Sequence, residues 1–476
     1  MGHDDAPRVT RPSISRSFGV LSVGQILSRL LAFAVIVHLS RVLGPEGFGV
    51  IVFATSVLGY AALVVEMGFD TLGPLEVARG DIPVPALARA VVTLRLLLLA
   101  GGFGVVALFA WLAPVTTVTR IAILVYGVSL VANVFDLGWV FLGGQRVGPV
   151  AVAEIANQAL QATGAFLLVR EPEDLLRMPW VFVASRAITV AGLALAFRQR
   201  HGALGIGFDR PILRRLLPAS VPLSGATTLG TLLTSFDMIL MGLWRGTSAA
   251  GVYGAAYRVA WVPSMLASAY FTTLRPALAR SSPAGFAAVA PVLRRSLRIA
   301  GATGIGIAAG GFVLADPLVG MLYGPQFAGA ATPLRLLLVS VALLLVSRHY
   351  RALLQAFQRP GLDFRIMLAA GAVNVFLNLL LVPRLGLLGA AATSVTCETL
   401  ILAASFLAAR RVVGDATDVR ALAGSLACAA IMAVAVHFAT ALPLLARMAF
   451  GAAVYSALVL AFRVVSIEDL REALRT

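Results

Sequence analysis

The chain has 476 residues, of which 59% are hydrophobic and only 13% are charged, and its mean hydropathy is +0.92. A water-soluble protein of this length needs more polar residues to cover its surface, so the composition excludes a soluble globular protein and predicts an integral membrane protein. The net charge of +16 does not indicate nucleic-acid binding, because the basic residues are scattered through short loops and form no continuous basic face.

Long apolar runs without alternation fill most of the sequence, and each is long enough to cross a bilayer as a helix. The first run follows a polar, basic segment over residues 1–17; it is too long for the apolar core of a signal peptide and has no clear cleavage site, so we expect this run to be retained. In chain order we predict about fourteen spans, at residues 18–38, 48–72, 89–113, 118–142, 147–169, 178–198, 217–243, 249–273, 296–322, 333–357, 363–382, 386–408, 421–441 and 444–464.

The loop charges predict the orientation of these spans. With the N-terminus inside, about 25 arginines fall in inner loops and about 8 in outer loops, as the positive-inside rule requires. The bias runs along the whole chain. We therefore expect an all-α protein of a bacterial plasma (inner) membrane, with cytoplasmic N- and C-termini.

Two glycine-containing phrases indicate an internal duplication. "LSRVLGPEGFGVIVFA" spans residues 39–54 and "LWRGTSAAGVYGAAYR" spans residues 243–258. Gly44 and Gly49 in the first phrase correspond to Gly246 and Gly251 in the second, at an offset of 202 residues. Locally, glycine permits the φ > 0 conformations of a tight outer turn. Six spans separate the copies, so the halves share one orientation about an axis along the membrane normal, an arrangement typical of transporters.

Several phrases in a fixed order resemble one family. They are "RVLGPEGFGVIVFA", "EMGFDTLGPLEVAR", "FDLGWVFLGGQRV", "DMILMGLWRGTSAAGVYGAAYRV", "LYGPQFAGAATPLRLL" and "GLLGAAATSVTCE". Together they are similar to the oligosaccharide-lipid (O-antigen type) flippases of the multidrug/oligosaccharidyl-lipid/polysaccharide exporter superfamily. The resemblance covers almost the whole chain.

This resemblance implies two six-helix bundles around a central cavity, related by a pseudo-twofold axis along the membrane normal, with two extra C-terminal helices. It implies alternating access and a substrate made of an oligosaccharide on a polyprenyl pyrophosphate. The expected domains are a tail at 1–17, a bundle at 18–200, a linker at 201–216, a second bundle at 217–410, and the last two helices with a tail at 411–476.

Arginines inside the apolar runs are the candidate substrate-binding residues, because intramembrane charge is costly and marks substrate pathways. Arg29 in the first span and Arg258 in the eighth are suited to hold a pyrophosphate or an acidic sugar. The alternative is a structural ion pair with Asp237. Arg186 and Arg348 are further candidates for lining the cavity.

The remaining intramembrane charges have other expected roles. Arg95 lies near the inner end of its span, so we expect its side chain to snorkel to the interface. Asp237 and Glu398 are possible ion-coupling residues. The acids at the inner ends of spans are expected to cap helices or form ion pairs: Glu66, Asp70 and Asp136.

Other functions remain as alternatives. A cation-coupled multidrug antiporter of the same superfamily would want an acidic pocket, whereas here arginines predominate. A sugar-repeat polymerase or ligase would need a large outer loop, and a membrane scaffold would have a closed, apolar interior. We expect no enzyme activity, no cofactor and no metal site. We expect a monomer that meets a lipid-linked oligosaccharide, membrane lipids, and the glycan polymerase and glycosyltransferases of its pathway.

Overall fold

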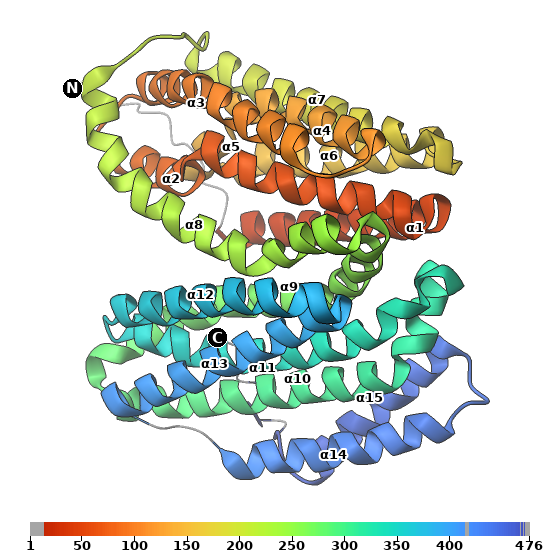
Figure 1. The fold of residues 1–476 in the computed structure, drawn as a ribbon. Helices are drawn as coiled ribbons and strands as arrows, with labels where there is room; N and C mark the ends of the chain where they lie inside the picture. The colour runs from red at the N-terminus through yellow and green to blue at the C-terminus, as the bar shows by residue number, and fades with distance from the viewer. Residues whose placement is uncertain (1–13, 415–417, 467, 470, 472–476) are drawn as a thin grey trace. The chain divides into compact units, whose positions relative to one another are not determined.

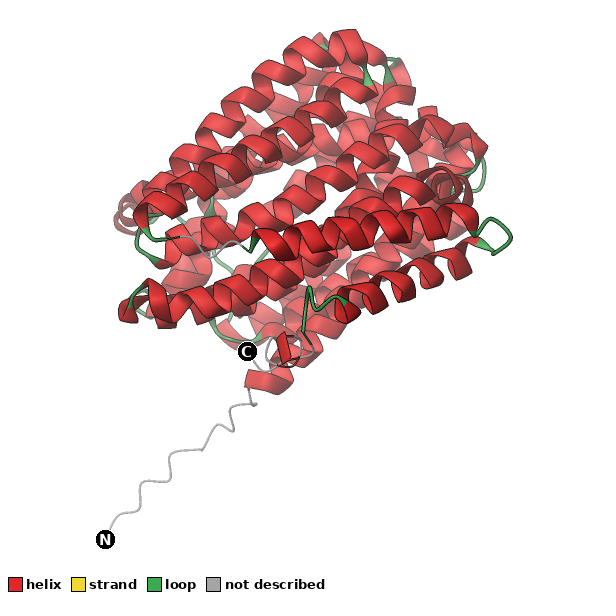
Figure 2. Ribbon diagram, turned by 90° about the horizontal axis from the view of Figure 1, so that it is seen from below, coloured by secondary structure: helices red, strands yellow, loops and turns green. Residues whose placement is uncertain are grey.

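The computed structural model describes residues 14–414, 418–466, 468–469 and 471, and these residues form helices joined by short turns (Figure 1). Figure 2 shows no strand among them. Most of the predicted N-terminal segment and the end of the C-terminal tail lie outside the described residues.

Fifteen α-helices and three short 3₁₀ helices make up the described chain. The α-helices are α1 (Ile14–Glu66), α2 (Phe69–Arg79), α3 (Val84–Leu112), α4 (Thr117–Val134), α5 (Gly138–Gly143), α6 (Val147–Leu168), α7 (Arg177–His201), α8 (Arg210–Arg245), α9 (Thr247–Ser281), α10 (Phe286–Tyr323), α11 (Ala331–Ala356), α12 (Pro360–Leu385), α13 (Leu387–Val412), α14 (Val419–Phe438) and α15 (Leu444–Ala461). The 3₁₀ helices are η1 (Pro172–Leu176), η2 (Ser282–Ala284) and η3 (Pro325–Ala330).

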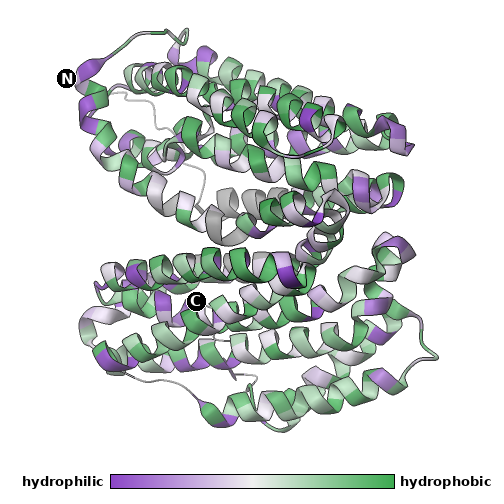
Figure 3. Ribbon diagram, viewed as in Figure 1, coloured by the Kyte–Doolittle hydropathy of each residue, from purple (hydrophilic) through white to green (hydrophobic). Residues whose placement is uncertain are grey.

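The helices carry the composition of membrane spans. Ten described helical segments are long and apolar enough to cross a membrane, or eleven if the two segments of α8, Arg210–Thr231 and Ser235–Arg245, form one span. Figure 3 shows that hydrophobic residues predominate along them. The prediction of an all-helical, multi-pass membrane protein is confirmed.

The chain divides into two compact units. The first contains the residues up to Leu43 and Ala54–Thr231, and the second contains Gly44–Phe53 and the described residues from Leu232 onward. In the first unit α4 packs against α3 and α7, α6 packs against α7, and α2 packs against α5. In the second unit α11 packs against α9, α10 and α13, while α14 packs against α10 and α15. Residues 44–53 of α1 thus belong to the same unit as α9.

The glycine phrases have two different structural roles. Gly44 and Gly246 have φ of 64° and 87°, in the left-handed region, so they interrupt or begin helices as expected for turns. Gly49 and Gly251 instead lie inside α1 and α9, within the predicted spans 48–72 and 249–273, and take no part in a turn. They are the points at which the two helices meet backbone to backbone.

This meeting of α1 and α9 is reciprocal. A Cβ added to Gly49 would lie 1.7 Å from the Thr247 carbonyl oxygen, and one added to Gly251 would lie 2.0 Å from the Pro45 carbonyl oxygen. Each glycine therefore contacts the residue four positions before the other glycine. The contact is what a local twofold axis through two equivalent helices would produce.

An added methyl group at this crossing would overlap backbone atoms of the other helix. We expect Gly49→Ala to lower the thermal stability of the detergent-solubilised protein, because overpacking typically costs about 1–3 kcal/mol and here the backbone itself must move. Gly59→Ala, also in α1, is the matched control, because a Cβ there meets nothing within 4 Å. Equal melting temperatures for the two variants would contradict the contact.

Ion pairs fasten the C-terminal helices to α10. Arg298 Nε donates to Asp418 Oδ2 at 2.7 Å, and Arg295 Nε donates to Asp469 Oδ1 at 3.1 Å. Burial raises the pKa of Asp418, but the Ala421 N–H and Arg298 more than offset it, so the pKa lies below its usual value. The pKa of Asp469 is lowered likewise, by Ser466 and Arg295 against the effect of burial.

These depressed pKa values give a pH dependence with a definite sign. Their stabilising contribution is present above the ordinary aspartate pKa and is lost as the pH falls below about 4, through the folded-state values. A variant with Asp418→Asn and Asp469→Asn should therefore melt at a lower temperature than the parent at pH 7. The difference should shrink as the pH is lowered from about 4 to about 3. A difference that grows on acidification would show that these carboxylates do not stabilise the folded protein.

Candidate functional site

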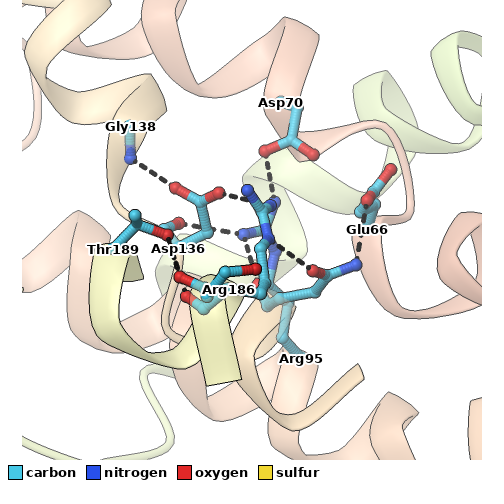
Figure 4. A network of polar contacts seen from close by, with 9 residues as sticks. Glu66, Asp70, Arg95, Asp136, Gly138, Arg186 and Thr189 are labelled. Atoms are coloured by element: carbon cyan, nitrogen blue, oxygen red, sulfur yellow. Dashed lines mark hydrogen bonds and ion pairs between the residues drawn. The ribbon is translucent and has the colours of Figure 1, made fainter. Parts of the chain in front are cut away.

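A network of polar side chains lies among the apolar helices of the first unit (Figure 4). Its cationic members are Arg95 on α3 and Arg186 on α7. The other charged or amide members lie where helices begin or end: Glu66, Asp70, Asn133 and Asp136.

Arg95 is the buried centre of this network. Its side chain is 1% exposed, and its Nη2 pairs with Asp70 Oδ1 at 2.8 Å. Its Nη1 donates to the carbonyl oxygens of Asn133 and Asp136, at 3.3 and 3.2 Å. The C-terminal end of α4 carries the negative end of a helix dipole, which favours a cation there. The expectation that Arg95 snorkels to the interface is therefore wrong: the interior of the unit supplies its acceptors.

Two breaks in the helices create these acceptors. Met67 and Gly68 both have positive φ, 45° and 77°, so α1 ends at Glu66 and α2 starts afresh at Phe69. The predicted span 118–142 is likewise interrupted between α4 and α5, where the Asp136 carboxylate accepts the N–H of Gly138 at 2.9 Å. Helix ends therefore lie beside the arginines, and their backbone groups that have no partner within the helix can bind the guanidinium groups.

Arg186 makes a more accessible part of the network. Its Nη2 pairs with Asp136 Oδ2 at 2.7 Å and its Nε donates to Asn133 Oδ1 at 3.3 Å, while its side chain stays 32% exposed. Asn133 Nδ2 in turn donates to Glu66 Oε1 at 3.4 Å. The expected pairing of Asp70 and Asp136 with basic groups is confirmed, and a substrate reaching Arg186 would compete with Asp136.

Phenyl rings lie beneath both candidate arginines of the second unit. Arg258 Cζ lies over the ring of Phe48, 5.1 Å from its centroid. Arg348 Cζ lies over the ring of Phe271, 5.9 Å from its centroid. Both distances fall within the range of about 6 Å in which a cation is attracted to a ring face.

The two candidate ion-coupling acids have hydroxyl donors. Asp237 is 5% exposed; its Oδ2 accepts the Tyr253 hydroxyl at 2.7 Å and its Oδ1 accepts the Met238 N–H at 2.8 Å. Glu398 Oε2 accepts the hydroxyl of Ser347, which precedes Arg348, at 3.4 Å. Within the described residues, no group of three or more His, Cys, Asp or Glu side chains is placed to hold a metal ion.

Arg29 lies on the part of α1 that belongs to the first unit, and it is exposed. The structure thus joins Arg186 to the acids Asp136 and, through Asn133, Glu66. Sequence reasoning missed Arg95 as the centre of this network and missed both phenyl rings. The phrases "EMGFDTLGP" and "FDLG" could have indicated this network. Each places Asp and Gly within an apolar run, and such residues mark points at which a helix is interrupted.

The comparisons with known proteins place this architecture in a family. Residues 14–282 match the family model described as polysaccharide biosynthesis protein, which is more than half of the chain. The chain belongs to the polysaccharide biosynthesis protein family. The family expected from the sequence is therefore confirmed.

Two relatives of this polysaccharide biosynthesis protein match over most of their length. A protein of Escherichia coli strain K12 to which O-antigen transport is ascribed is 23% identical over 400 residues, covering 82% of this chain and 95% of the relative. A protein of Haloferax volcanii to which a low-salt glycan biosynthesis flippase role is ascribed is also 23% identical over 400 residues, covering 79% of each. Among solved structures, the lipid II flippase MurJ in an inward closed conformation has a TM-score of 0.75 at 11% identity, covering 93% of this chain and 98% of that one. The similarity to the MurJ structure shows that this chain has the same fold.

The buried guanidinium of Arg95 should be essential for stability. We expect Arg95→Met to lower the melting temperature in detergent, because the carbonyl groups of Asn133 and Asp136 lose their donor and a buried unsatisfied group typically costs about 1–3 kcal/mol. Arg198→Met is the control, because Arg198 is exposed in the last turn of α7, where a basic residue is typically worth about 1 kcal/mol or less. An Arg95→Met protein as stable as its parent would contradict the central place given to Arg95.

Proposed function

We propose that this protein is a flippase that moves a polyprenyl-pyrophosphate-linked oligosaccharide across a bacterial plasma membrane by alternating access. The observation that carries this proposal is its membership of the polysaccharide biosynthesis protein family over residues 14–282. The relatives that match over most of their length are associated with O-antigen transport and glycan flipping. The chemistry is transport, with no covalent step.

The placement of arginines supports an anionic cargo. Four candidate arginines lie within helices of apolar composition: Arg29, Arg186, Arg258 and Arg348. A guanidinium is weakly hydrated and offers in-plane donors that match phosphate oxygens two at a time, so it can replace the water that a pyrophosphate loses on leaving the aqueous phase. In this proposal Arg29 and Arg258 contact the pyrophosphate or an acidic sugar, and Arg186 and Arg348 are further contacts.

The same proposal includes a duplicated architecture of about fourteen spans. The helices α1, α3, α4, α6 and α7 would supply the first six spans, with α1 counted twice on either side of Gly44, and α8 to α13 the second six. The reciprocal contact of Gly49 and Gly251 supports duplication, because equivalent positions of two repeats meet there. The helices α14 and α15 are then the extra pair, with both termini cytoplasmic by the loop charges.

Asp237 and Glu398 are the proposed coupling residues. Ionisable side chains inside membrane spans mark ion pathways and proton relays, so a buried carboxylate can take up a cation or a proton and release it on the other side of the membrane. Asp237 suits this role because a hydroxyl and a backbone N–H hold it in place without neutralising its charge.

Removing a substrate arginine tests this function. In a strain that depends on this gene for its surface glycan, Arg29→Ala or Arg258→Ala should abolish export, while the protein still accumulates in the membrane fraction. Arg384→Ala, an exposed arginine at the end of α12, should leave export intact. Surface glycan is measured by gel electrophoresis and immunoblotting.

Normal surface glycan in both arginine variants would remove these residues from the mechanism. If deletion of the gene from its native host leaves the surface glycan normal and instead sensitises the cell to cationic drugs, the protein is a multidrug antiporter of the same superfamily.

A further inference from the structure

The pairing of arginines with phenyl rings occurs at both candidate substrate arginines of the second unit. Phe48 and Phe271 are themselves buried, at 1% and 4% exposure. Each ring is held by other aromatic groups, so it is a fixed surface for the guanidinium above it. Phe48 meets the ring of Phe327 edge to face, with centroids 6.1 Å apart.

The helix crossing at Gly49 and Gly251 places Phe48 on Arg258. Thr247, Gly251, Gly254 and Arg258 recur at helical spacing, so they form one stripe along α9. Residues 44–53 of α1 lie against this stripe: a Cβ on Gly254 would meet Val52 Cγ1 at 2.9 Å and Arg258 Nη1 at 3.3 Å. The absence of side chains at both glycines lets the helices approach until the Phe48 ring reaches the guanidinium.

The pairing breaks the symmetry of the duplication. At the repeat offset of 202 residues, Gly49 matches Gly251 and Val52 matches Gly254, and these positions meet one another. Phe48, however, matches Ala250, and Arg258 matches Ser56. The contact between the Phe48 ring and the Arg258 guanidinium therefore joins non-equivalent positions of the two repeats. Duplication alone does not account for it.

The second ring is held by a chain of hydrogen bonds. Phe271 lies against His349, with ring centroids 4.7 Å apart. His349 Nδ1 contacts the Leu345 carbonyl oxygen at 2.8 Å and its Nε2 contacts Ser296 Oγ at 2.6 Å. The Tyr270 hydroxyl donates to the same Ser296 Oγ at 2.7 Å. Because a carbonyl can only accept, Nδ1 donates to Leu345, and Ser296, whose Oγ accepts from Tyr270, can in turn donate to Nε2, so the imidazole ring is fixed in orientation.

We propose that Phe48 is a positioning residue that holds Arg258 for diphosphate binding, and that Phe271 does the same for Arg348. A ring attracts a guanidinium through the faces of the two groups, whereas phosphate oxygens bind its N–H groups at the edge, in the plane. The ring can therefore fix the cation without competing with the ligand, as a carboxylate would. This inference rests on the proposed function, because it gives Arg258 and Arg348 a diphosphate to bind.

Fluorinated phenylalanines test the role of Phe48 without altering its shape. Fluorine withdraws electron density from the ring face, so mono-, di- and trifluorophenylalanine at position 48 should weaken binding stepwise. The probe is farnesyl diphosphate, titrated calorimetrically into the purified protein. We expect the trifluorinated protein and Phe48→Leu to bind about three- to tenfold more weakly than the parent, as the loss of one cation–π contact implies. The same series at Phe327, which touches Phe48, should stay within about twofold.

Arg258→Ala separates the two proposals. If it weakens binding while the fluorinated series at position 48 does not, the positioning role of Phe48 is wrong and the substrate role of Arg258 stands. If Arg258→Ala leaves binding unchanged, the proposed substrate contact itself fails. With Arg258→Ala in place, trifluorination of Phe48 should have no further effect. If trifluorination still lowers the affinity by its full factor in the Arg258→Ala protein, the ring affects binding by a route other than Arg258.

Discussion

A guanidinium inside an apolar helix must be given partners by the protein, because lipid provides none. This requirement organises the described structure. In the first unit, the partners are carboxylates and helix-end carbonyl groups around Arg95 and Arg186. In the second unit, phenyl rings lie under Arg258 and Arg348. The first arrangement offsets charge and fixes structure, whereas in our proposal the second orients a cation that also binds an anionic ligand.

Irregular backbone makes both arrangements possible. The breaks at residues 67–68 and 135–137 turn helix ends toward Arg95, so polar backbone groups are available within an otherwise apolar unit. The close approach at Gly49 and Gly251 brings residues 44–53 onto α9 and with them the Phe48 ring. In each case the contacts of a charged side chain depend on a glycine or a helix end far from it in sequence.

The sequence predicted the helical membrane fold and the family because both depend on local signals. Long apolar runs predict helices wherever they occur, and the two glycine phrases can be recognised as copies in the sequence itself. The roles of individual residues depended on tertiary contacts. Position in the span placed Arg95 near the interface, but the break at Met67 and Gly68 set Asp70 beside it. Gly44 and Gly49 look alike in the sequence, yet one sets a left-handed backbone angle and the other a helix crossing. No pattern in the sequence could pair Phe48 with Arg258, which are 210 residues apart.

The central claim is that intramembrane arginines carry an anionic head group. The most direct measurement compares two lipids in proteoliposomes containing the purified protein: a polyprenyl-diphosphate oligosaccharide, and the same oligosaccharide on the same polyprenyl chain through an uncharged linkage. The account predicts protein-dependent translocation of the diphosphate lipid and little of the uncharged one. Equal translocation of both lipids would contradict it.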